Sequence, residues 1–429
     1  MKNLNSKIFL LLATCFFLAH MAKAQNGDTA IIRCVTTQRD SVQILKNPAL
    51  LKLRQNSEQA IQQYIRSNKS SLRVAADDII TIPVVVHVIH DQVTNKIGGE
   101  SNANISNEQV QSQIDVLNED YSNTSGYKGF YTDSLGNDTG IRFKLVTVIR
   151  KYSTHGQFSP ISDADVLASI SPPWFTNRFL NIWVCSLSSR YLGSSQFPTV
   201  SEVTSQTSGL STSDEDENYQ LTDGVIIDYR YFGRNSPAIT STLYNLGRTT
   251  THEIGHWLGL IHIWGDRYCG TDYCDDTPRA EDANQTTDVL CTPKFSNCGG
   301  VRSRNMIENY MDYSPDLCMS VFTSDQKARM QAVLALSPRR AKMVEYSKRT
   351  DKAVTVDLYP NPVSESLNAN VYTPDYKVFS VTIFNSAGMR MTDDIPNWTN
   401  IDVKNYPSGI YFLQVSTDTE MVTKRFLVR

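Results

Sequence analysis

Three histidines and one glutamate occur at a spacing that suits a metal ion. They lie in segment 251–262, THEIGHWLGLIH, which has the form H-E-x-x-H-x-x-G-x-x-H. His252 and His256 are four residues apart, so on a helix both imidazoles lie on one face and can bind a single ion. Glu253 follows His252 directly, where its carboxylate can reach a metal-bound water without becoming a ligand.

The third histidine, His262, cannot come from the same helical face. Gly259 resolves this, because a residue that can take a positive φ ends the helix and turns the chain back toward the metal. Three protein nitrogens leave a fourth position open for water, as in a catalytic rather than a structural zinc site. The alternative is an ordinary amphipathic helix with scattered histidines, which fits poorly with a chain that has only 7 His in 429 residues.

This arrangement predicts hydrolysis of an amide bond without a covalent intermediate. Glu253 is expected to act as general base toward the bound water, whose pKa zinc lowers toward neutrality. The same carboxylate would then return a proton to the leaving amine. The competing function is a non-catalytic surface module that keeps zinc for stability and binds other proteins.

The long zinc helix is similar to that of the metzincin clan, whose members have a methionine-containing turn downstream. Segment 309–313, NYMDY, resembles that turn. The resemblance implies that Met311 forms an apolar floor beneath the histidines and that Tyr313 can direct its hydroxyl toward the tetrahedral oxyanion. The alternative is a buried methionine in an unrelated turn, because Met readily fills gaps in cores.

A wider set of motifs resembles the pappalysin family of metallopeptidases, in particular its secreted bacterial branch. The matching segments are HWLGLIHIWGD (256–266), Cys269-Gly270, DTP (276–278), NYMDY with Cys318-Met319, LNIWV (180–184) and QFP (196–198). The resemblance covers about residues 80–335. It implies a zinc endopeptidase with a metzincin-like α/β domain, a mixed twisted sheet, a cleft between two lobes, and an irregular disulfide-bonded lower lobe.

The family resemblance also implies disulfides and a structural calcium ion. It pairs Cys269 with Cys298 and Cys291 with Cys318. Cys274 stands where the family often has an apolar residue, and our own prediction pairs it with Cys185. For calcium, the acidic turn at 272–277 supplies the hard oxygen ligands Asp272, Asp275, Asp276 and Thr277; a solvated acidic loop is the alternative. Some family members have an acidic wall that favours cleavage before Arg or Lys, but Met319 and Ser320 follow Cys318 here.

One cysteine is left over near the start of the chain. Beyond Cys15 in the leader there are seven cysteines, and in an exported chain six of them can form three disulfides. Arg33-Cys34-Val35 resembles the short motif by which some relatives stay latent, with a thiolate in the open position of zinc, although Val35 replaces the usual glycine. A free or intermolecularly paired Cys34 is the alternative.

Several secondary-structure elements must position these groups. An α/β domain is predicted from strands and helices with matching periodicity. We expect strands at 80–90, 141–149, 179–187 and 225–231, a helix that begins at Ser106, and a zinc helix over 241–260.

The ends of the chain carry sorting signals. Residues 1–24 have the basic start, short apolar run and A-x-A exit of a secretory signal peptide, and 25–78 form a short pro-segment with a helix near 48–67 before a catalytic domain at 79–345. Residues 351–429 read as a small all-β sandwich that resembles the C-terminal sorting domains of the type IX secretion pathway; a generic immunoglobulin-like adhesive module is the alternative. The sorting resemblance implies export through the periplasm of a Gram-negative bacterium to the medium or cell surface.

Composition excludes some partners. The net charge is −3, which provides no electrostatic footprint for nucleic acid. No stretch after the leader is long and apolar enough to span a bilayer. The expected partners are protein or peptide substrates and the secretion machinery, and the expected cofactors are Zn²⁺ and Ca²⁺.

Overall fold

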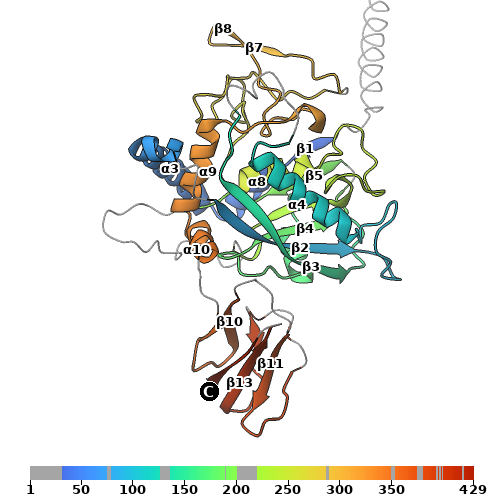
Figure 1. Cartoon of the computed structure of the whole chain (residues 1–429), viewed down its shortest axis with the longest axis vertical. Helices are drawn as coiled ribbons and strands as arrows, with labels where there is room; N and C mark the ends of the chain where they lie inside the picture. The colour runs from blue at the N-terminus through green and yellow to red at the C-terminus, as the bar shows by residue number, and fades with distance from the viewer. Residues whose placement is uncertain are drawn as a thin grey trace, which may run out of the picture.

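The computed structural model describes residues 31–74, 79–125, 136–188, 190–200, 220–286, 289–348, 353–373, 380–392, 395, 398, 400–417 and 420–429 (Figure 1). The predicted signal peptide, 1–24, lies outside these residues. Figure 1 shows a larger mixed unit of helices and strands, with a smaller all-β unit at the C-terminus. Within the described residues, no helix combines the length and the apolar character needed to cross a membrane.

A six-stranded sheet forms the base of the larger unit, in the order β1-β5-β6-β4-β2-β3. Its strands are β1 (Ile32–Cys34), β2 (Ile80–His90), β3 (Ile141–Tyr152), β4 (Leu180–Cys185), β5 (Tyr191–Ser195) and β6 (Val225–Asp228). Neighbours pair in parallel except β5 and β6, which are antiparallel. Strands β2, β4 and β6 are almost wholly buried, as apolar runs in a parallel sheet covered on both faces should be.

Helix α4 (Asn107–Tyr121) begins where the sequence predicts. The side chain of Ser106 caps it by accepting a hydrogen bond from the backbone N–H of Gln109. Its periodic apolar residues are buried in the main core with α8 and the sheet: Val110, Ile114, Leu117 and Tyr121. The 3.6-residue period therefore identified the core face correctly.

The zinc helix, α8 (Arg248–Trp257), is shorter than the predicted range of 241–260. Gly247, at φ 78°, stands at its N-cap, and residues before it run as loop. All ten residues of α8 are buried, so the helix has no exposed polar face and is surrounded by the rest of the larger unit.

The remaining helices frame the sheet. They are α2 (Thr36–Lys46), α3 (Ala49–Val74), α6 (Ala164–Ile170), α9 (Ser324–Leu336) and α10 (Pro338–Ser347), with short 3₁₀ turns η1 (Tyr229–Tyr231) and η2 (Asp316–Cys318). Strand β1 and helices α2 and α3 make up residues 31–74, hereafter the N-terminal segment. This segment adds β1 to the sheet beside β5 and lays α3 along α9 (Figure 1).

Two of the three expected disulfides are present. Cys269–Cys298 and Cys291–Cys318 cross-link the irregular region that contains the hairpin of β7 (Phe295–Cys298) and β8 (Val301–Arg304). The third pairing, Cys185 with Cys274, is wrong, because both thiols are free and buried. Cys185 ends β4 within an apolar cluster of the sheet, whereas Cys274 lies in the loop beside Asp272, so the two thiols have different surroundings.

The C-terminal unit is a β-sandwich, as the alternating pattern predicts. One sheet has the order β12-β10-β9 and the other β11-β13-β14. The strands are β9 (Thr355–Tyr359), β10 (Ser366–Tyr372), β11 (Ser380–Asn385), β12 (Ile401–Asp402), β13 (Gly409–Ser416) and β14 (Met421–Val428). This unit contacts the larger one through the rings of Trp174 and Trp398, 4.8 Å apart, and through a hydrogen bond from Arg178 to the carbonyl of Val371.

Candidate functional site

The turn after α8 brings the third histidine back toward the first two. Gly259 has φ 86°, and a Cβ there would approach Val333 to 2.6 Å. The backbone N–H of Leu260 donates to the carbonyl of Gly255, 2.9 Å away, which closes the helix end. Glycine is therefore required at 259 both for its conformation and for its close packing, as the sequence predicts.

The three imidazoles converge on one point. The Nε2 atoms of His252, His256 and His262 lie 3.1–3.2 Å from one another. Each Nδ1 faces an oxygen: the carbonyl of Tyr310 for His252, the carbonyl of Leu260 for His256, and the carboxylate of Asp266 for His262. An Nδ1–H that donates to such an oxygen leaves its Nε2 as a bare lone pair.

Three lone pairs at this separation repel one another unless a cation lies among them. Burial holds the pKa of His252 well below its ordinary value and lowers that of His256 to about 3, so both rings are neutral. Neutral imidazoles with oriented Nδ1–H groups are the donor set that zinc takes in proteins. The residues therefore fit a zinc ion.

Met311 and Tyr313 both lie beside the zinc helix and its histidines. A Cβ on Gly255 would collide with the sulfur of Met311, so the methionine packs directly beneath the zinc helix. The ring of Tyr313 lies 5.0 Å from that of His262 and 5.8 Å from that of His252. Its hydroxyl donates to the carbonyl of Cys34 at 3.2 Å, and burial raises the pKa of Tyr313, so the hydroxyl keeps its proton.

Glu253 is buried beside the histidines and is already engaged. Its Oε2 accepts a 2.7 Å hydrogen bond from the hydroxyl of Thr36, in the N-terminal segment. Burial raises the pKa of Glu253 to about 7. The same Thr36 oxygen accepts from the backbone N–H of Ser195, the last residue of β5. Thr36 is not among the residues that the sequence predicts for the site, because nothing in its local pattern marks a contact with Glu253.

Cys34 joins the histidine group. One ligand atom each from Cys34, His252, His256 and His262 lie within 4.8 Å of one another. Among the residues that the structure describes, this is the one such group of three or more His, Cys, Asp or Glu. Strand β1 holds Cys34 there by pairing with β5, where Cys34 lies opposite Gly193. Val35 has φ −127°, a conformation open to any residue, so the position does not require glycine.

The buried side chain of Arg33 fills a pocket beside this group. Arg33 is fully buried there: it forms an ion pair of 3.2 Å with Asp316, donates to the carbonyl of Ser314, and lies 4.9 Å from the ring centre of Tyr244. The carboxylate that meets Arg33 comes from Asp316, two positions before Cys318, and not from Met319 or Ser320 after it. An Asp two positions before a cysteine carries no periodic signal in the sequence.

The acidic residues proposed for calcium do not form a metal-type group among the described residues. Asp272 is buried and both its oxygens accept from the hydroxyl of Thr277. Asp276 instead accepts from the backbone N–H of Asp325, and the N–H of Asp275 donates to the Asp325 carboxylate. The turn is therefore tied to the start of α9, and calcium there stays a prediction.

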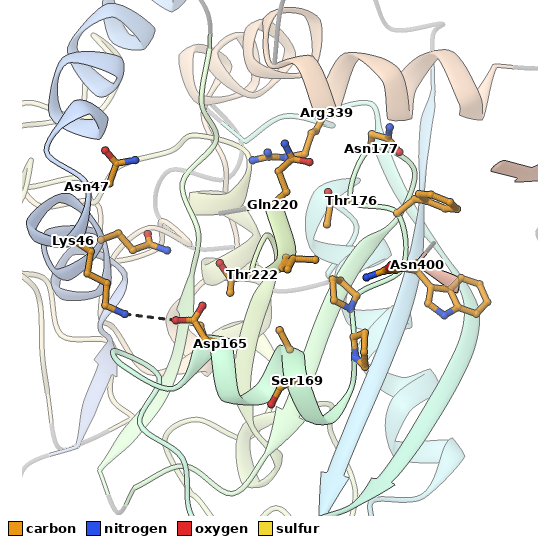
Figure 2. Close-up of a pocket in the computed structure, with 18 of the residues that line it drawn as sticks. Lys46, Asn47, Asp165, Ser169, Thr176, Asn177, Gln220, Thr222, Arg339 and Asn400 are labelled. Carbon is orange, nitrogen blue, oxygen red and sulfur yellow. Dashed lines mark ion pairs between the residues drawn. The ribbon is translucent and has the colours of Figure 1, made fainter. Parts of the chain in front are cut away.

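A separate hollow of about 1390 Å³ lies away from the histidines. It is lined by α2, α6, segments near 172–177 and 220–222, the start of α10 and strands of the C-terminal unit. Figure 2 shows the ion pair of Lys46, at the end of α2, with Asp165 of α6, 3.6 Å apart. No zinc-helix residue lines this hollow, so the chemistry has to be sought at the histidine group.

Comparison with known proteins agrees with this geometry. The family model described as pregnancy-associated plasma protein-A matches residues 214–335, and that of the secretion system C-terminal sorting domain matches 357–429. An extracellular metalloprotease of Arthroderma benhamiae is 31% identical over 271 residues, which cover 62% of this chain and 75% of the relative. One of Colletotrichum graminicola is 28% identical over 278 residues, 63% of this chain and 84% of the relative.

Solved structures of metallopeptidases are also similar to this chain. A promirolysin mutant of Tannerella forsythia aligns with a TM-score of 0.54 and 31% identity, over 73% of this chain and 97% of that one. Mature mirolysin of the same organism, in complex with a cleaved peptide, aligns with a TM-score of 0.51 and 34% identity, over 62% of this chain and 96% of that one. The chain thus belongs to the pregnancy-associated plasma protein-A, or pappalysin, family and is a secreted zinc metalloendopeptidase with a C-terminal secretion-system sorting domain.

Proposed function

We propose that this endopeptidase is made as a latent precursor whose N-terminal segment blocks the catalytic groups one by one. The observation that carries the proposal is the placement of the Cys34 sulfur with the three histidine nitrogens. A thiolate is a strong zinc ligand and would take the coordination position that hydrolysis needs for water. Two neighbouring contacts extend the block, since Thr36 engages Glu253 and the carbonyl of Cys34 engages Tyr313.

In the mature enzyme, His252, His256 and His262 would hold the metal. Zinc, when bound, supplies a Lewis acid that polarises the scissile carbonyl and acidifies a water molecule. Glu253 would take the proton of the attacking water and return it to the leaving amine. Tyr313, which keeps its proton, would donate to the oxygen of the scissile group as negative charge develops on it. Met311 supports the zinc helix from below and takes no part in proton transfer.

The edge of β5 is the proposed binding site for the substrate backbone. Strand β1 occupies this edge in parallel orientation, with the N–H of Ile32 donating to the carbonyl of Arg190 and that of Val35 to the carbonyl of Gly193. A peptide added to a free sheet edge gains main-chain hydrogen bonds irrespective of its sequence. Specificity then has to come from side-chain pockets.

The pocket that holds Arg33 supports a preference for a basic residue next to the scissile bond. Arg33 directly precedes the residue that reaches the zinc site, and its guanidinium is matched by the carboxylate of Asp316. A substrate that runs antiparallel to β5, opposite in direction to β1, would place its P1′ side chain in this pocket. The reversed direction of β1 would also keep the N-terminal segment from being cut as a substrate.

The decisive experiment compares the processed protein with two variants on a denatured protein substrate. Cleavage should disappear with a chelator, return with Zn²⁺, and be lost in Glu253→Ala. Cys34→Ala should cut itself prematurely during expression. Intact activity in Glu253→Ala would remove the assigned base, whereas unchanged processing of Cys34→Ala would remove only the latency mechanism.

Two further assignments are proposals of the same kind. Export through the periplasm by the type IX machinery would use the C-terminal unit as its signal. A structural calcium ion would bind at Asp272, Asp275, Asp276 and Thr277, since calcium takes carboxylate and hydroxyl oxygens. Added Ca²⁺ should then raise the melting temperature of the full chain but not that of Asp272→Asn.

A further inference from the structure

Helix α3 gives the N-terminal segment a second attachment, away from the zinc ligands. Ile61 is buried against Val200 of the loop after β5 and against Ala332, Val333 and Leu336 of α9. Ala60, Tyr64 and Ile65 pack on the same cluster. The apolar positions of α3 are three or four residues apart, so they form one stripe that faces α9.

A buried ion pair lies at the head of this stripe. The guanidinium of Arg329, in α9, meets both carboxylate oxygens of Glu58 in a fork-like contact, with Nη1 to Oε1 at 2.7 Å. The side chain of Arg329 is 3% exposed and that of Glu58 20%. Removing one partner of such a pair leaves an uncompensated buried charge, so this surface strongly favours an acidic occupant.

Arg329 also connects this surface to the catalytic turn. Its Nε donates a 2.7 Å hydrogen bond to the carbonyl of Gly259, the residue that turns the chain toward His262. The carboxylate of Asp272, in the loop between α8 and β7, also interacts electrostatically with the guanidinium, but its oxygens already accept from Thr277. Glu58 is thus the carboxylate that forms the direct forked contact with Arg329 among the described residues.

We propose that this face of α9 is an independent docking site for α3, which keeps the N-terminal segment on the enzyme after its contact with the zinc site is broken. The occupant is an amphipathic helix with one carboxylate and apolar residues three and seven positions later, as Glu58, Ile61 and Ile65 provide. Two linked attachments retain a segment far longer than either alone, because loss of one leaves the other intact.

The consequence concerns how the enzyme becomes active. Withdrawal of Cys34, or a cut after the N-terminal segment, would not by itself release the segment. Full activation would also require α3 to leave α9 or to be cut within the helix. The inference rests on the proposed latency of the precursor, but docking itself can be measured without any processing.

The test uses hydrogen exchange of the full chain, with Glu253→Ala in every sample to prevent self-cleavage. Adding Cys34→Ala breaks the contact with the zinc site, and we expect the amides of α3 to exchange within about threefold of their former rates. Adding Glu58→Gln to that variant should speed their exchange by about tenfold or more, because Arg329 loses its charged partner. Ile61→Ser should act in the same direction, and the exposed Gln59→Ala is the matched control.

The outcomes separate the two proposals. If Cys34→Ala alone makes α3 exchange as fast as the Glu58→Gln variant does, the docking site is not independent and the inference fails. Unchanged exchange in both Glu58→Gln and Ile61→Ser would also overturn it. Loss of latency in active Cys34→Ala is a different measurement, so the zinc-site mechanism can fail while the docking site stands, or the reverse.

Discussion

The hydroxyl of Thr36 donates a 2.7 Å hydrogen bond to the carboxylate of Glu253, so a residue of the N-terminal segment satisfies the very group that should activate water. Thr36 stands two positions after Cys34, and the two side chains engage the general base and the metal site together. The proposed latency would therefore involve the base as well as the metal.

Thr36→Val should weaken latency even with Cys34 intact. The substitution keeps the shape of the side chain but removes a hydrogen bond to a charged group, which is worth about 1.5–3 kcal/mol. We expect self-activation of the purified precursor to become at least about tenfold faster, measured by the rate at which the mature band appears on a gel. Thr36→Ser retains the hydroxyl and should behave like the parent; equal rates for Val and Ser would refute a role for this contact.

Asp316→Asn should reduce the preference for basic residues next to the cleaved bond. Asn keeps an oxygen that can accept from the backbone N–H of Leu246, so the local fold is retained while the charge is lost. The expected fall in kcat/KM is about 10- to 100-fold for peptides with Arg or Lys at that position, with little change for neutral ones. Mass spectrometry of a cleaved peptide library measures the ratio, and an unaltered ratio would exclude the pocket as the specificity site.

The disulfide Cys291–Cys318 should matter for selectivity as well as stability. Cys318 ends η2, the short turn that begins with Asp316, so the bridge holds the acidic residue in place. Replacing both cysteines with serine should lower stability by up to about 3.5 kcal/mol, as loop entropy predicts for this span, and should also reduce the basic preference.

The matched control for that change is the other bridge. Cys269–Cys298 spans 29 residues and Cys291–Cys318 spans 27, so their entropic contributions should be nearly equal. Removing Cys269–Cys298 should lower the urea midpoint to a similar degree without altering the peptide-library profile. If both double variants change the peptide-library profile, the change in selectivity comes from a general loss of stability and not from displacement of Asp316.

The ion-pair cluster around Asp223 should make the free energy of unfolding depend on pH in the acidic range. Burial alone would raise the pKa of Asp223, but Arg340 and Arg339 outweigh it and lower the pKa to about 2. The folded-state pKa is thus below the unfolded value of about 3.9, so the stabilisation of about 2.5 kcal/mol is present above pH 4 and is lost as the pH falls toward 2.

Asp223→Asn tests this directly. The Asp223 carboxylate also accepts a 2.9 Å hydrogen bond from the indole of Trp257, at the end of the zinc helix. The variant should lose about 3–5 kcal/mol at neutral pH, since two buried guanidinium groups lose their counter-charge, and should show a flatter decline in the urea midpoint between pH 4 and 2. Asp115→Asn, at an exposed position of α4, is the control, and an unchanged acid slope in Asp223→Asn would contradict the assignment.

Features encoded within a few turns of the chain could be predicted. The zinc helix, the Gly259 turn, the cap of α4 at Ser106 and the period of its buried face all follow from local backbone geometry. Helix α8 begins at Arg248 and not at 241 as predicted. Residues that tolerate a helical conformation do not show where the preceding loop ends, because tertiary packing decides that point. The wrong pairing of Cys185 with Cys274 has the same origin, since counting cysteines says nothing of their separation in space.

The sequence by itself determined the metal-binding chemistry. His256 and His262 follow His252 by four and ten positions, and a helix with a turn at its end brings side chains at this spacing together through local backbone geometry alone. Tertiary structure alone decided how the N-terminal segment meets the rest of the enzyme. Its contacts join Thr36 to Glu253, Arg33 to Asp316 and Glu58 to Arg329. Each of these joins segments more than 200 positions apart. Such contacts depend on strand β1 entering the sheet beside β5 and on α3 packing against α9, and no periodic pattern in one stretch of chain specifies the partner of another.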